Sequence, residues 1–436
     1  MATKDDLIIR TLPDGLVLRR SCPEDCDAVA AFNREQFNEE GCERWTRALF
    51  AGLCPGTTAS DFLIIEDTTL DRIVSTLVLL KERWAYGGVE FGFGRPEMVA
   101  THPDYRRRGL IRHLFHQYHL WSAESGHLVE GITGILNFYR QFDYEYALAL
   151  DSWWALLPGA AASLPEGQEE PFHFRPAVQA DLSFISRLAK QTEAYGLVAR
   201  IYDEAFCAWH LAGSLAEQPA WHLRIIERPS GEAVGALRTA NAWGRAETVD
   251  MAELMPGMNW LEAAPSLLRH LKTAGLAAAA SDPKQSFESL RFRLPLSHPL
   301  FGILKGHEPH VDAGYAWYLR VHDLPRFLLH IKPVLEARLA ASAWAGWSGE
   351  LHIGQYRTGL KLTFTTGALA SVESYRPEVG QDENARFPEL TFLQLLFGYR
   401  SLSELEHAFA DVSVSGATRG LIETLFPKSE SCVLGG

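Results

Sequence analysis

The first part of the chain alternates apolar and polar residues with two different periods. Short apolar or alternating runs predict strands, and recurrence at i, i+3, i+4 and i+7, as at Ile111, Leu114, Phe115 and Tyr118, predicts a helix. The predicted elements are strands 15–20, 61–66, 73–80, 87–101 and 128–133, helices within 23–53, over 108–124 and at 137–141, and two closing strands up to residue 155. This mixture predicts layered α/β packing, in which helices flank a sheet.

The same patterning contains two breaks. Residues 158–171 are rich in Gly, Pro, Ala and Glu without periodicity, which predicts a linker. The segment from Phe172 loosely repeats the strand and acid-capped helix that begin at Leu16, which indicates an internal repeat at domain scale. After a second break near 306–316, we expect a strand at 315–321, a helix at 324–341, strands at 349–354, 359–365 and 368–374, and short helices at 391–397 and 401–409. The expected domains are 1–157, 172–310 and 311–436.

Composition excludes several classes of protein. Of the 436 residues, 47% are hydrophobic and 22% charged, so the chain can bury several cores. A net charge of −13 disfavours nucleic-acid binding and favours amines. The six cysteines follow no disulfide pattern, the first residues carry acids where a signal peptide needs a basic region followed by an apolar one, and no apolar run reaches the roughly 18 residues of a membrane span. We expect a cytoplasmic protein with no nucleic-acid or membrane partner.

Residues 97–112 carry the strongest chemical pattern. A strand ends near Thr101, and a turn at 106–109, with the sequence Arg-Arg-Arg-Gly, leads into the amphipathic helix. A helix N-terminus exposes unpaired N–H groups and the positive end of the helix dipole, and glycine permits close approach to the backbone. Three guanidinium groups supply the charge that a pyrophosphate requires. The pattern predicts a phosphate-binding turn; the alternative is a basic, capped helix without a ligand.

This segment resembles a known family. Arg106, Gly109 and Ile111 follow the spacing of the acetyl-coenzyme A (acetyl-CoA) signature of the GNAT superfamily of N-acetyltransferases, although a small residue usually stands at the place of Ile111. The run at 106–111 is similar to the enhanced intracellular survival (Eis) type, and this similarity covers nearly the whole chain. It implies an α/β (α+β) fold with two tandem GNAT-type mixed sheets and flanking helices, the second domain being degenerate. A C-terminal α+β domain like sterol carrier protein would follow.

The resemblance also implies which residues hold acetyl-CoA, the co-substrate. The backbone of Val99, Ala100 and Thr101 would face the pantetheine arm. The residues implied around the pyrophosphate are Arg107, Arg108, Gly109, Leu110, Ile111 and Arg112. We expect no metal, because the rotation of about 100° per residue spreads His113, His116 and His119 around the helix.

A second segment, 137–144, resembles the superfamily's Phe-Tyr-x-x-x-Gly-Phe element, with Asp143 in place of the glycine. By this match Tyr139 is the candidate general acid that protonates the departing thiolate of coenzyme A. A phenol with an ordinary pKa of about 10 suits this role, because its pKa is close to that of an alkyl thiol. The alternative is that Tyr139 is a core aromatic residue. Gly134 and Ile135 also differ from the Ser-Glu pair usual in the Eis type.

Several carboxylates are candidates for the base that accepts the amine proton. The Eis-type resemblance implies the terminal carboxylate, here that of Gly436, although Gly-Gly replaces the usual aromatic last residue. Glu39 and Glu40 are further candidates near the amine entrance.

We therefore expect an acetyl-CoA-dependent N-acetyltransferase that acts by direct transfer on a primary amine, such as a lysine side chain, a polyamine or an aminoglycoside. Resemblance further implies a homohexamer. The alternative is a non-catalytic protein that binds coenzyme A or lipid. Trp344, Trp347 and the helix at 391–397 fit either a packed core or an apolar tunnel.

Overall fold

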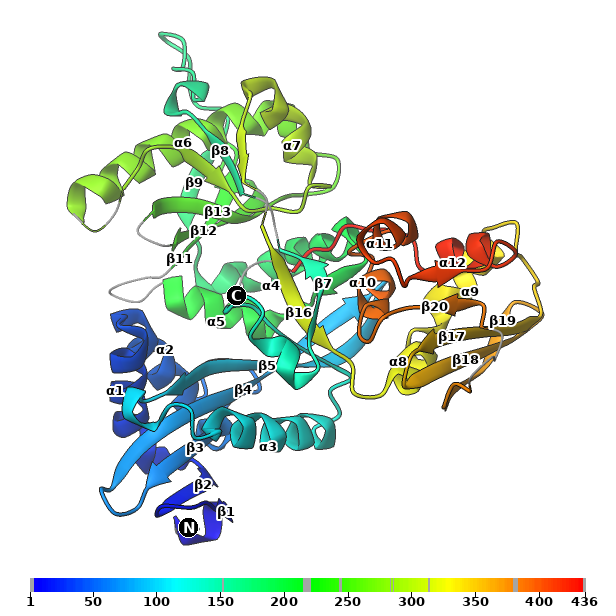
Figure 1. The fold of residues 1–436 in the computed structure, drawn as a ribbon. Helices are drawn as coiled ribbons and strands as arrows, with labels where there is room; N and C mark the ends of the chain where they lie inside the picture. Colours follow the sequence, from blue (N-terminus) through cyan, green and yellow to red (C-terminus); the bar gives the residue numbers. More distant parts are fainter. Residues whose placement is uncertain are drawn as a thin grey trace. The chain divides into compact units, whose positions relative to one another are not determined.

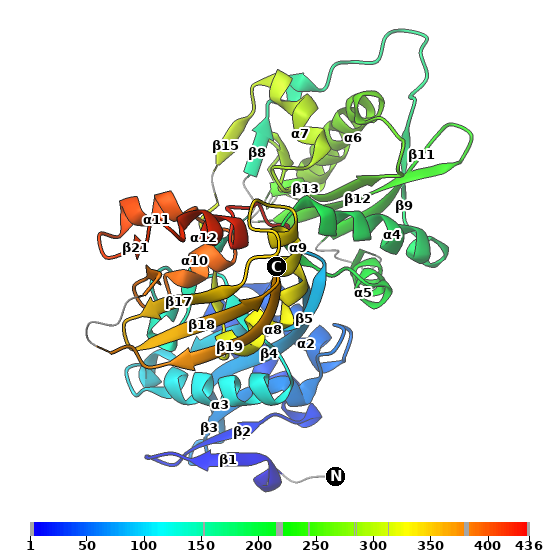
Figure 2. The ribbon, with the colours of Figure 1, turned by 90° about the vertical axis from the view of Figure 1, so that its right-hand side faces the viewer.

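The computed structural model describes residues 4–150, 153–214, 221–242, 245–282, 284, 286–312, 314–378 and 383–433. By its contacts the chain divides into two units: the first joins Met1–Leu148 with Trp317–Lys428, and the second joins Ala149–Ala316 with Ser429–Gly436. Both units contain mixed sheets with flanking helices (Figures 1 and 2), which confirms the predicted α/β fold class. The domain boundaries drawn from the sequence stay a prediction.

The large sheet of the first unit has the order β1-β2-β3-β4-β5-β6-β16-β7. Its strands are β1 (Ile8–Thr11), β2 (Leu16–Arg20), β3 (Phe62–Asp67), β4 (Arg72–Tyr86), β5 (Val89–Thr101), β6 (Val129–Ile132), β16 (Ala316–Arg320) and β7 (Glu145–Ala149). Helix α3 (Leu110–Glu124) packs its apolar stripe on one face through residues such as Leu114 and Phe115. Helices α1 (Cys26–Phe37) and α2 (Glu40–Phe50) pack against each other (Figure 1), and α1 contacts β4 and β5.

Two strands lie where the sequence did not predict them. We expected both strands up to residue 155 to close the first sheet, but only β7 does so. β8 (Trp153–Leu156) instead pairs with β14 (Leu290–Phe292) and β15 (His310–Asp312) in the second unit. β16, expected to begin the third domain, lies between β6 and β7. Its residues Trp317, Tyr318 and Leu319 are all buried, as both faces of a central strand require.

The chain after β16 builds a smaller sheet in the order β19-β18-β17-β20-β21. Its elements are β17 (Gly349–Gln355), β18 (Thr358–Thr365), β19 (Ala368–Tyr375), β20 (Ala385–Arg386), β21 (Ser413–Val414), α8 (Leu324–His330), α9 (Lys332–Ala340), α10 (Phe392–Leu396), α11 (Leu402–Ala408) and α12 (Arg419–Leu425). The single helix predicted over 324–341 is two helices, because Pro333 cannot continue a helix and starts α9 instead. All five residues of α10 are buried.

The second unit has one sheet in the order β15-β8-β14-β13-β12-β11-β9. Its remaining elements are β9 (His173–Pro176), β10 (Val198–Arg200), β11 (Trp221–Glu227), β12 (Ala233–Ala242), β13 (Arg245–Leu254), α4 (Leu182–Ala189), α5 (Glu204–Ser214), α6 (Trp260–Ser281) and α7 (Pro299–Leu304). α6 packs along β13 (Figure 2). It continues to Ser281, because the Ala-rich sequence of its second half favours helix.

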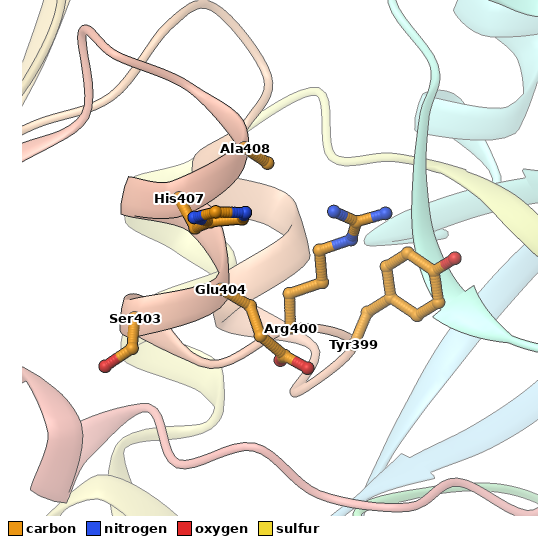
Figure 3. Close-up of a pocket in the computed structure, with 6 residues that line it drawn as sticks. All are labelled: Tyr399, Arg400, Ser403, Glu404, His407 and Ala408. Carbon is orange, nitrogen blue, oxygen red and sulfur yellow. The ribbon is translucent and has the colours of Figure 1, made fainter.

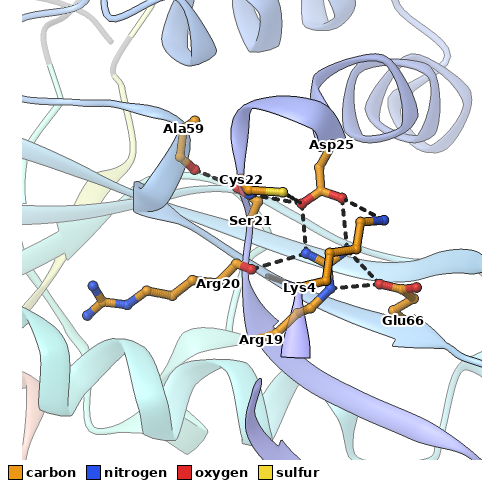
Figure 4. Close-up of polar contacts among 8 residues, drawn as sticks. All are labelled: Lys4, Arg19, Arg20, Ser21, Cys22, Asp25, Ala59 and Glu66. Carbon is orange, nitrogen blue, oxygen red and sulfur yellow. Dashed lines mark hydrogen bonds and ion pairs between the residues drawn. The ribbon is translucent and has the colours of Figure 1, made fainter. Parts of the chain in front are cut away.

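A buried ion-pair cluster connects the first elements of the first unit (Figure 4). Arg19 on β2 donates from Nη1 and Nη2 to Asp25 at 2.7 and 2.8 Å, and from Nε to Glu66 on β3 at 2.7 Å. Asp25 also accepts the backbone N–H of Cys22 at 2.9 Å. The cluster thereby ties the first strand, the entry to α1 and the neighbouring strand together.

The second unit repeats this cluster at equivalent positions. Arg175 on β9 donates to Asp181 at 2.7 and 2.9 Å and to Glu227 on β11 at 2.9 Å, and Asp181 accepts the N–H of Val178 at 2.8 Å. In both clusters the aspartate lies six residues after the arginine. The glutamate stands on the neighbouring strand, opposite the residue two positions before that arginine. The coincidence of sequence spacing and strand register supports the internal repeat inferred from the sequence.

Candidate active site

The candidate site begins where two neighbouring strands separate. β5 and β6 run parallel, with Phe93 opposite Val129 and Gly94 opposite Glu130. β5 then continues to Thr101 with partners in β4 but none in β6, and every residue of this segment is described. We call the opening between residues 95–101 of β5 and the end of β6 the fork.

A bulge at Met98 sets the direction of one peptide group in the fork. The pairing of β4 with β5 shifts by one residue here, and Met98 has a φ of 50°, in the left-handed region. Its carbonyl oxygen accepts the hydroxyl of Thr76 on β4 at 2.9 Å. The N–H of a trans peptide points opposite to the carbonyl. The N–H of Val99 therefore points away from Thr76 and β4.

The peptide group two residues further along β5 repeats this direction. The carbonyl oxygen of Ala100 accepts the hydroxyl of Ser75 at 2.7 Å, so the N–H of Thr101 also points away from β4. The carbonyl oxygen of Thr101 accepts Nε of Arg106 at 3.3 Å. The fork is thus lined by N–H groups of β5 that a ligand can reach.

A buried tyrosine anchors the turn between β5 and α3. Tyr105, the last residue of a short 3-10 helix, is 8% exposed and donates its hydroxyl to Asp67 at the end of β3 at 2.7 Å. The guanidinium of Arg108 lies 4.9 Å from the centre of its ring. The basic turn is therefore held against the sheet rather than free in solvent.

The turn enters α3 through two left-handed residues. Arg107 has a φ of 64°, and Gly109, the N-cap of α3, has a φ of 77°. A β carbon at Gly109 would meet no atom within 4 Å, so the space over this residue is open. The N–H groups of Leu110 and Ile111 have no acceptor within the helix, because they lie in its first turn.

The arginines of the turn give it a concentrated positive charge. Arg106, Arg107 and Arg108 are all exposed. Arg108 lies 3.9 Å from a carboxylate oxygen of Asp14, and Arg107 has no hydrogen bond or ion pair with any described residue. Open space, first-turn N–H groups and three cations together fit a pyrophosphate group, and the adjoining fork fits an extended chain such as pantetheine.

Tyr139 lies on the other side of the fork. It begins a short 3-10 helix after β6, and its ring is 4% exposed and packs on Phe115, Tyr144 and Tyr318. A β carbon built on Gly134 would lie 3.8 Å from the tyrosine hydroxyl oxygen. The ring of Tyr139 is thus buried in the core, while its hydroxyl reaches the residues that directly follow β6, so the structure leaves both of its predicted roles open.

Two carboxylates lie near the fork on the side of α2. Glu39, which precedes α2, has a carboxylate oxygen 3.8 Å from the thiol of Cys42. Burial, together with the negative charges of Glu39 and Glu97, raises the pKa of Cys42 to about 11. Glu97 on β5 accepts Nε of Arg95 at 2.8 Å through Oε1, and its other oxygen accepts no hydrogen bond from a described residue. The side chain of Glu40 lies outside the described residues.

The structure brings most of the residues predicted from the sequence into one region. Residues 99–101 and 107–111 form one continuous path along the fork and into α3. Arg112, also exposed, donates to Gln141 at 3.3 Å, in the helix that begins at Tyr139, and its predicted contact with the pyrophosphate stays a prediction. Gly436 lies outside the described residues, so its predicted role as base stays a prediction.

Sequence reasoning missed three residues that shape the site. Thr76 orients a peptide of β5, Tyr105 anchors the turn, and Glu97 adds a carboxylate beside the bulge. Only Tyr105 had a sequence signal, as an isolated apolar residue directly before the arginine run. The other two lie within strands whose alternation does not mark a bulge.

A separate cavity of about 600 Å³ lies on α11 in the first unit (Figure 3). It is lined by Tyr399, Arg400, Ser403, Glu404, His407 and Ala408. Glu404 is already engaged, because it accepts Lys428 Nζ at 2.6 Å and the N–H of Ser401 at 2.7 Å. None of these residues belongs to the fork or the basic turn.

The described residues contain no group of three or more His, Cys, Asp or Glu side chains arranged to hold a metal ion. Nor does any described helix have the length and apolar character needed to cross a membrane.

Solved structures with the same fold cover almost the whole chain. A probable N-acyltransferase of unknown function from Enterococcus faecalis is 14% identical with a TM-score of 0.69, covering 96% of this chain and 99% of its own. A GCN5-related N-acetyltransferase from Kribbella flavida is 17% identical with a TM-score of 0.64 and the same coverage. Eis1 from Mycobacterium abscessus is 14% identical with a TM-score of 0.58, covering 94% and 97%. At these identities the likeness establishes a shared fold.

Sequence comparison adds the family of the first domain. No curated protein matches the chain. The profile of the acetyltransferase (GNAT) domain matches residues 18–147, which include part of β2, all of β3 to β6, the fork, the basic turn and Tyr139. Residues 18–147 are therefore similar to a GNAT acetyltransferase domain, which supports an enzyme of the acyltransferase class; acetyltransferases of this family use acetyl-CoA and an amine.

Proposed function

We propose that this enzyme transfers the acetyl group of acetyl-CoA directly to a primary amine while both substrates are bound. The observation that carries the proposal is the continuity of the fork with the basic turn. Inward N–H groups of β5 lead to a glycine-opened helix N-terminus with three arginines. One extended ligand with an acyl end and a diphosphate matches this sequence of environments.

Different residues bind different parts of acetyl-CoA. Arg107, Arg108 and the first-turn N–H groups of α3 hold the diphosphate, whereas Val99 and Thr101 bind the pantetheine arm and the acyl carbonyl. The donor supplies an acetyl group already activated as a thioester. Binding both substrates together supplies most of the remaining rate, because positioned reactants avoid a large loss of entropy at the transition state.

The chemistry needs one hydrogen-bond donor, one acid and one base. A neutral amine attacks the carbonyl carbon, and the N–H of Val99 stabilises the negative charge that develops on the carbonyl oxygen. The C–S bond then breaks, and Tyr139 donates its proton to the sulfur. The amine proton leaves through water towards Glu39, Glu97 or the terminal carboxylate of Gly436. The products are an acetamide and coenzyme A.

Several finer properties belong to the same proposal. The carboxylates beside Cys42 favour a cationic acceptor such as a lysine side chain, a polyamine or an aminoglycoside. The Eis type, the tandem GNAT arrangement, a sterol-carrier-like third domain, a hexamer and a cytoplasmic location are proposed from the sequence resemblance. The repeated ion-pair cluster supports the tandem arrangement.

Calorimetry and a thiol-release assay test the proposal. We expect acetyl-CoA and free coenzyme A to bind, and 3′-phosphoadenosine diphosphate, which lacks the pantetheine arm, to bind more weakly because it leaves the fork empty. Thiol release is then followed with N-α-acetyl-lysine amide, spermidine and kanamycin. If acetyl-CoA produces no heat of binding, the proposal is refuted.

A further inference from the structure

A chain of buried hydrogen bonds runs from the bulge of β5 to α2. Thr76 Oγ1 lies 2.9 Å from the carbonyl oxygen of Met98 and 2.9 Å from Oδ1 of Asn33 on α1. Asn33 Nδ2 donates to Thr46 Oγ1 at 3.0 Å, and Thr46 donates to the carbonyl oxygen of Cys42 at 2.7 Å. Asn33, Thr46 and Thr76 are 0% exposed. The three side chains thus connect the two helices to the bulge without solvent.

The hydroxyl of Thr76 is the critical member of this chain. It has one proton and two acceptors at equal distance, one on the bulge and one on Asn33. Met98 is a non-glycine residue with φ of 50°, a conformation that costs free energy and persists only when its surroundings impose it. Because the peptide between Met98 and Val99 is rigid, a contact that holds the carbonyl also aims the N–H.

We propose that Thr76, held in place by Asn33, is a positioning residue that aims the N–H of Val99 at the acyl carbonyl. This inference rests on the proposed function, in which Val99 stabilises the charge on that oxygen. It also links the two substrates: the chain ends at Cys42, beside the carboxylates proposed to receive the amine, and begins at the peptide that receives the acyl group.

The proposal predicts a change in turnover with little change in donor affinity. A peptide that is misdirected still occupies the fork, so most contacts with the pantetheine arm remain. Removing one donor to the developing negative charge costs about 100-fold to 1,000-fold in kcat in other acyl-transfer sites, and a donor that is only misaimed should cost less. We expect Thr76→Val to lower kcat by about 10-fold to 100-fold, with the acetyl-CoA dissociation constant changed by less than about 3-fold.

Thr57→Val is the matched control. Thr57 is also buried, 1% exposed, and its hydroxyl has no hydrogen-bond partner among the described residues. Both variants exchange a buried hydroxyl for a methyl group, but only one of the two hydroxyls contacts the bulge. Thr57→Val should retain the kcat of the parent enzyme.

Kinetics with spermidine and slow hydrolysis of acetyl-CoA by water measure the effect on chemistry. Hydrogen exchange of the peptide that spans 96–102 measures the bulge without turnover, and Thr76→Val should speed its exchange. Thr76→Ser and Thr76→Ala differ only in the hydroxyl, so Ser should restore kcat and Ala should not, even if Val disturbs folding. In a double-mutant cycle, Asn33→Ala should add little to the loss already caused by Thr76→Ala.

Equal kcat for Thr76→Ser and Thr76→Ala would overturn the proposal. So would unchanged hydrogen exchange in Thr76→Val. Failure of the proposed function is a different result, because the parent enzyme would then neither bind acetyl-CoA in calorimetry nor release thiol.

Discussion

A substitution at Gly109 can test the binding of acetyl-CoA separately from the stability of the fold. Gly109 caps α3 with a φ of 77°, and a β carbon there would touch no protein atom within 4 Å. Gly126, just beyond the other end of α3, has a φ of 84° and equally open surroundings. Gly109→Ala and Gly126→Ala therefore impose the same backbone strain, and only the first places a methyl group over the basic turn.

The two substitutions should cost the same stability but differ in affinity. An L-residue in the left-handed region costs about 1–2 kcal/mol, which lowers the melting temperature of a domain this size by a few degrees. A methyl group at Gly109 also separates the diphosphate from the N–H groups of Leu110 and Ile111. Losing one charge-assisted hydrogen bond of about 2 kcal/mol weakens binding by about 30-fold.

Thermal melting and calorimetry with acetyl-CoA provide the measurements. We expect similar melting temperatures for the two variants, unchanged affinity for Gly126→Ala and a loss of about 30-fold or more for Gly109→Ala. Equal affinities would show that the diphosphate does not lie over Gly109, and the reasoning from the turn would fail.

Three further predictions concern single side chains. Arg107→Gln should weaken acetyl-CoA binding by about 10-fold and reduce its salt dependence, measured by calorimetry at two ionic strengths. Tyr139→Phe should lower kcat by about 100-fold with nearly unchanged donor affinity, and unchanged turnover would dismiss Tyr139 as the acid. Burial opposes ionisation of Asp25, but hydrogen bonds from Arg19 and from the N–H of Cys22 outweigh it and hold the pKa of this carboxyl well below its usual range. The lowered pKa stabilises the folded state above about pH 4, and this stabilisation is lost as the pH falls towards the folded pKa. Asp25→Asn should therefore have a lower free energy of unfolding at pH 7. Its free energy of unfolding should also fall less than that of the parent between about pH 4 and 2, as measured by denaturant titrations.

The sequence predicted those parts of the site that depend on local chemistry. The order of strand, arginines, glycine and apolar helix stripe can be read from adjacent residues, and the structure has β5, the turn and α3 at those positions. Tyr139 could be assigned only by resemblance, because its approach to the end of β6 depends on the loop through Gly134.

Long-range pairing could not be predicted in the same way. The apolar run in β16 indicates a buried strand but not which sheet buries it, and it lies between β6 and β7 although about 170 residues separate them in sequence. The bulge at Met98 could not be predicted from the sequence either, because it depends on the register of β4 and on Thr76 rather than on any local pattern.

We expect each chain to bind one acetyl-CoA, in the first unit, because the second unit shares the fold of the first but not its basic turn. Its ion-pair cluster repeats that of the first unit, and β13 and β14 also pair in parallel, at Val249 and Phe292. However, the N-cap of α6 is Asn259, whose side chain accepts the N–H of Leu261 at 2.8 Å and so satisfies a group that Gly109 leaves exposed in α3.

The preceding segment, 253–258, also contains no arginine. A helix N-terminus that is capped by its own side chain and is not preceded by a run of arginines has less affinity for a diphosphate than the N-terminus of α3, so the second unit can share the fold of the first without sharing its binding site. Calorimetry should therefore give one acetyl-CoA per chain, and Gly109→Ala should weaken that single event. A stoichiometry of two would show that the second unit binds the donor without the basic turn, and the turn would then not be what determines binding in the first unit.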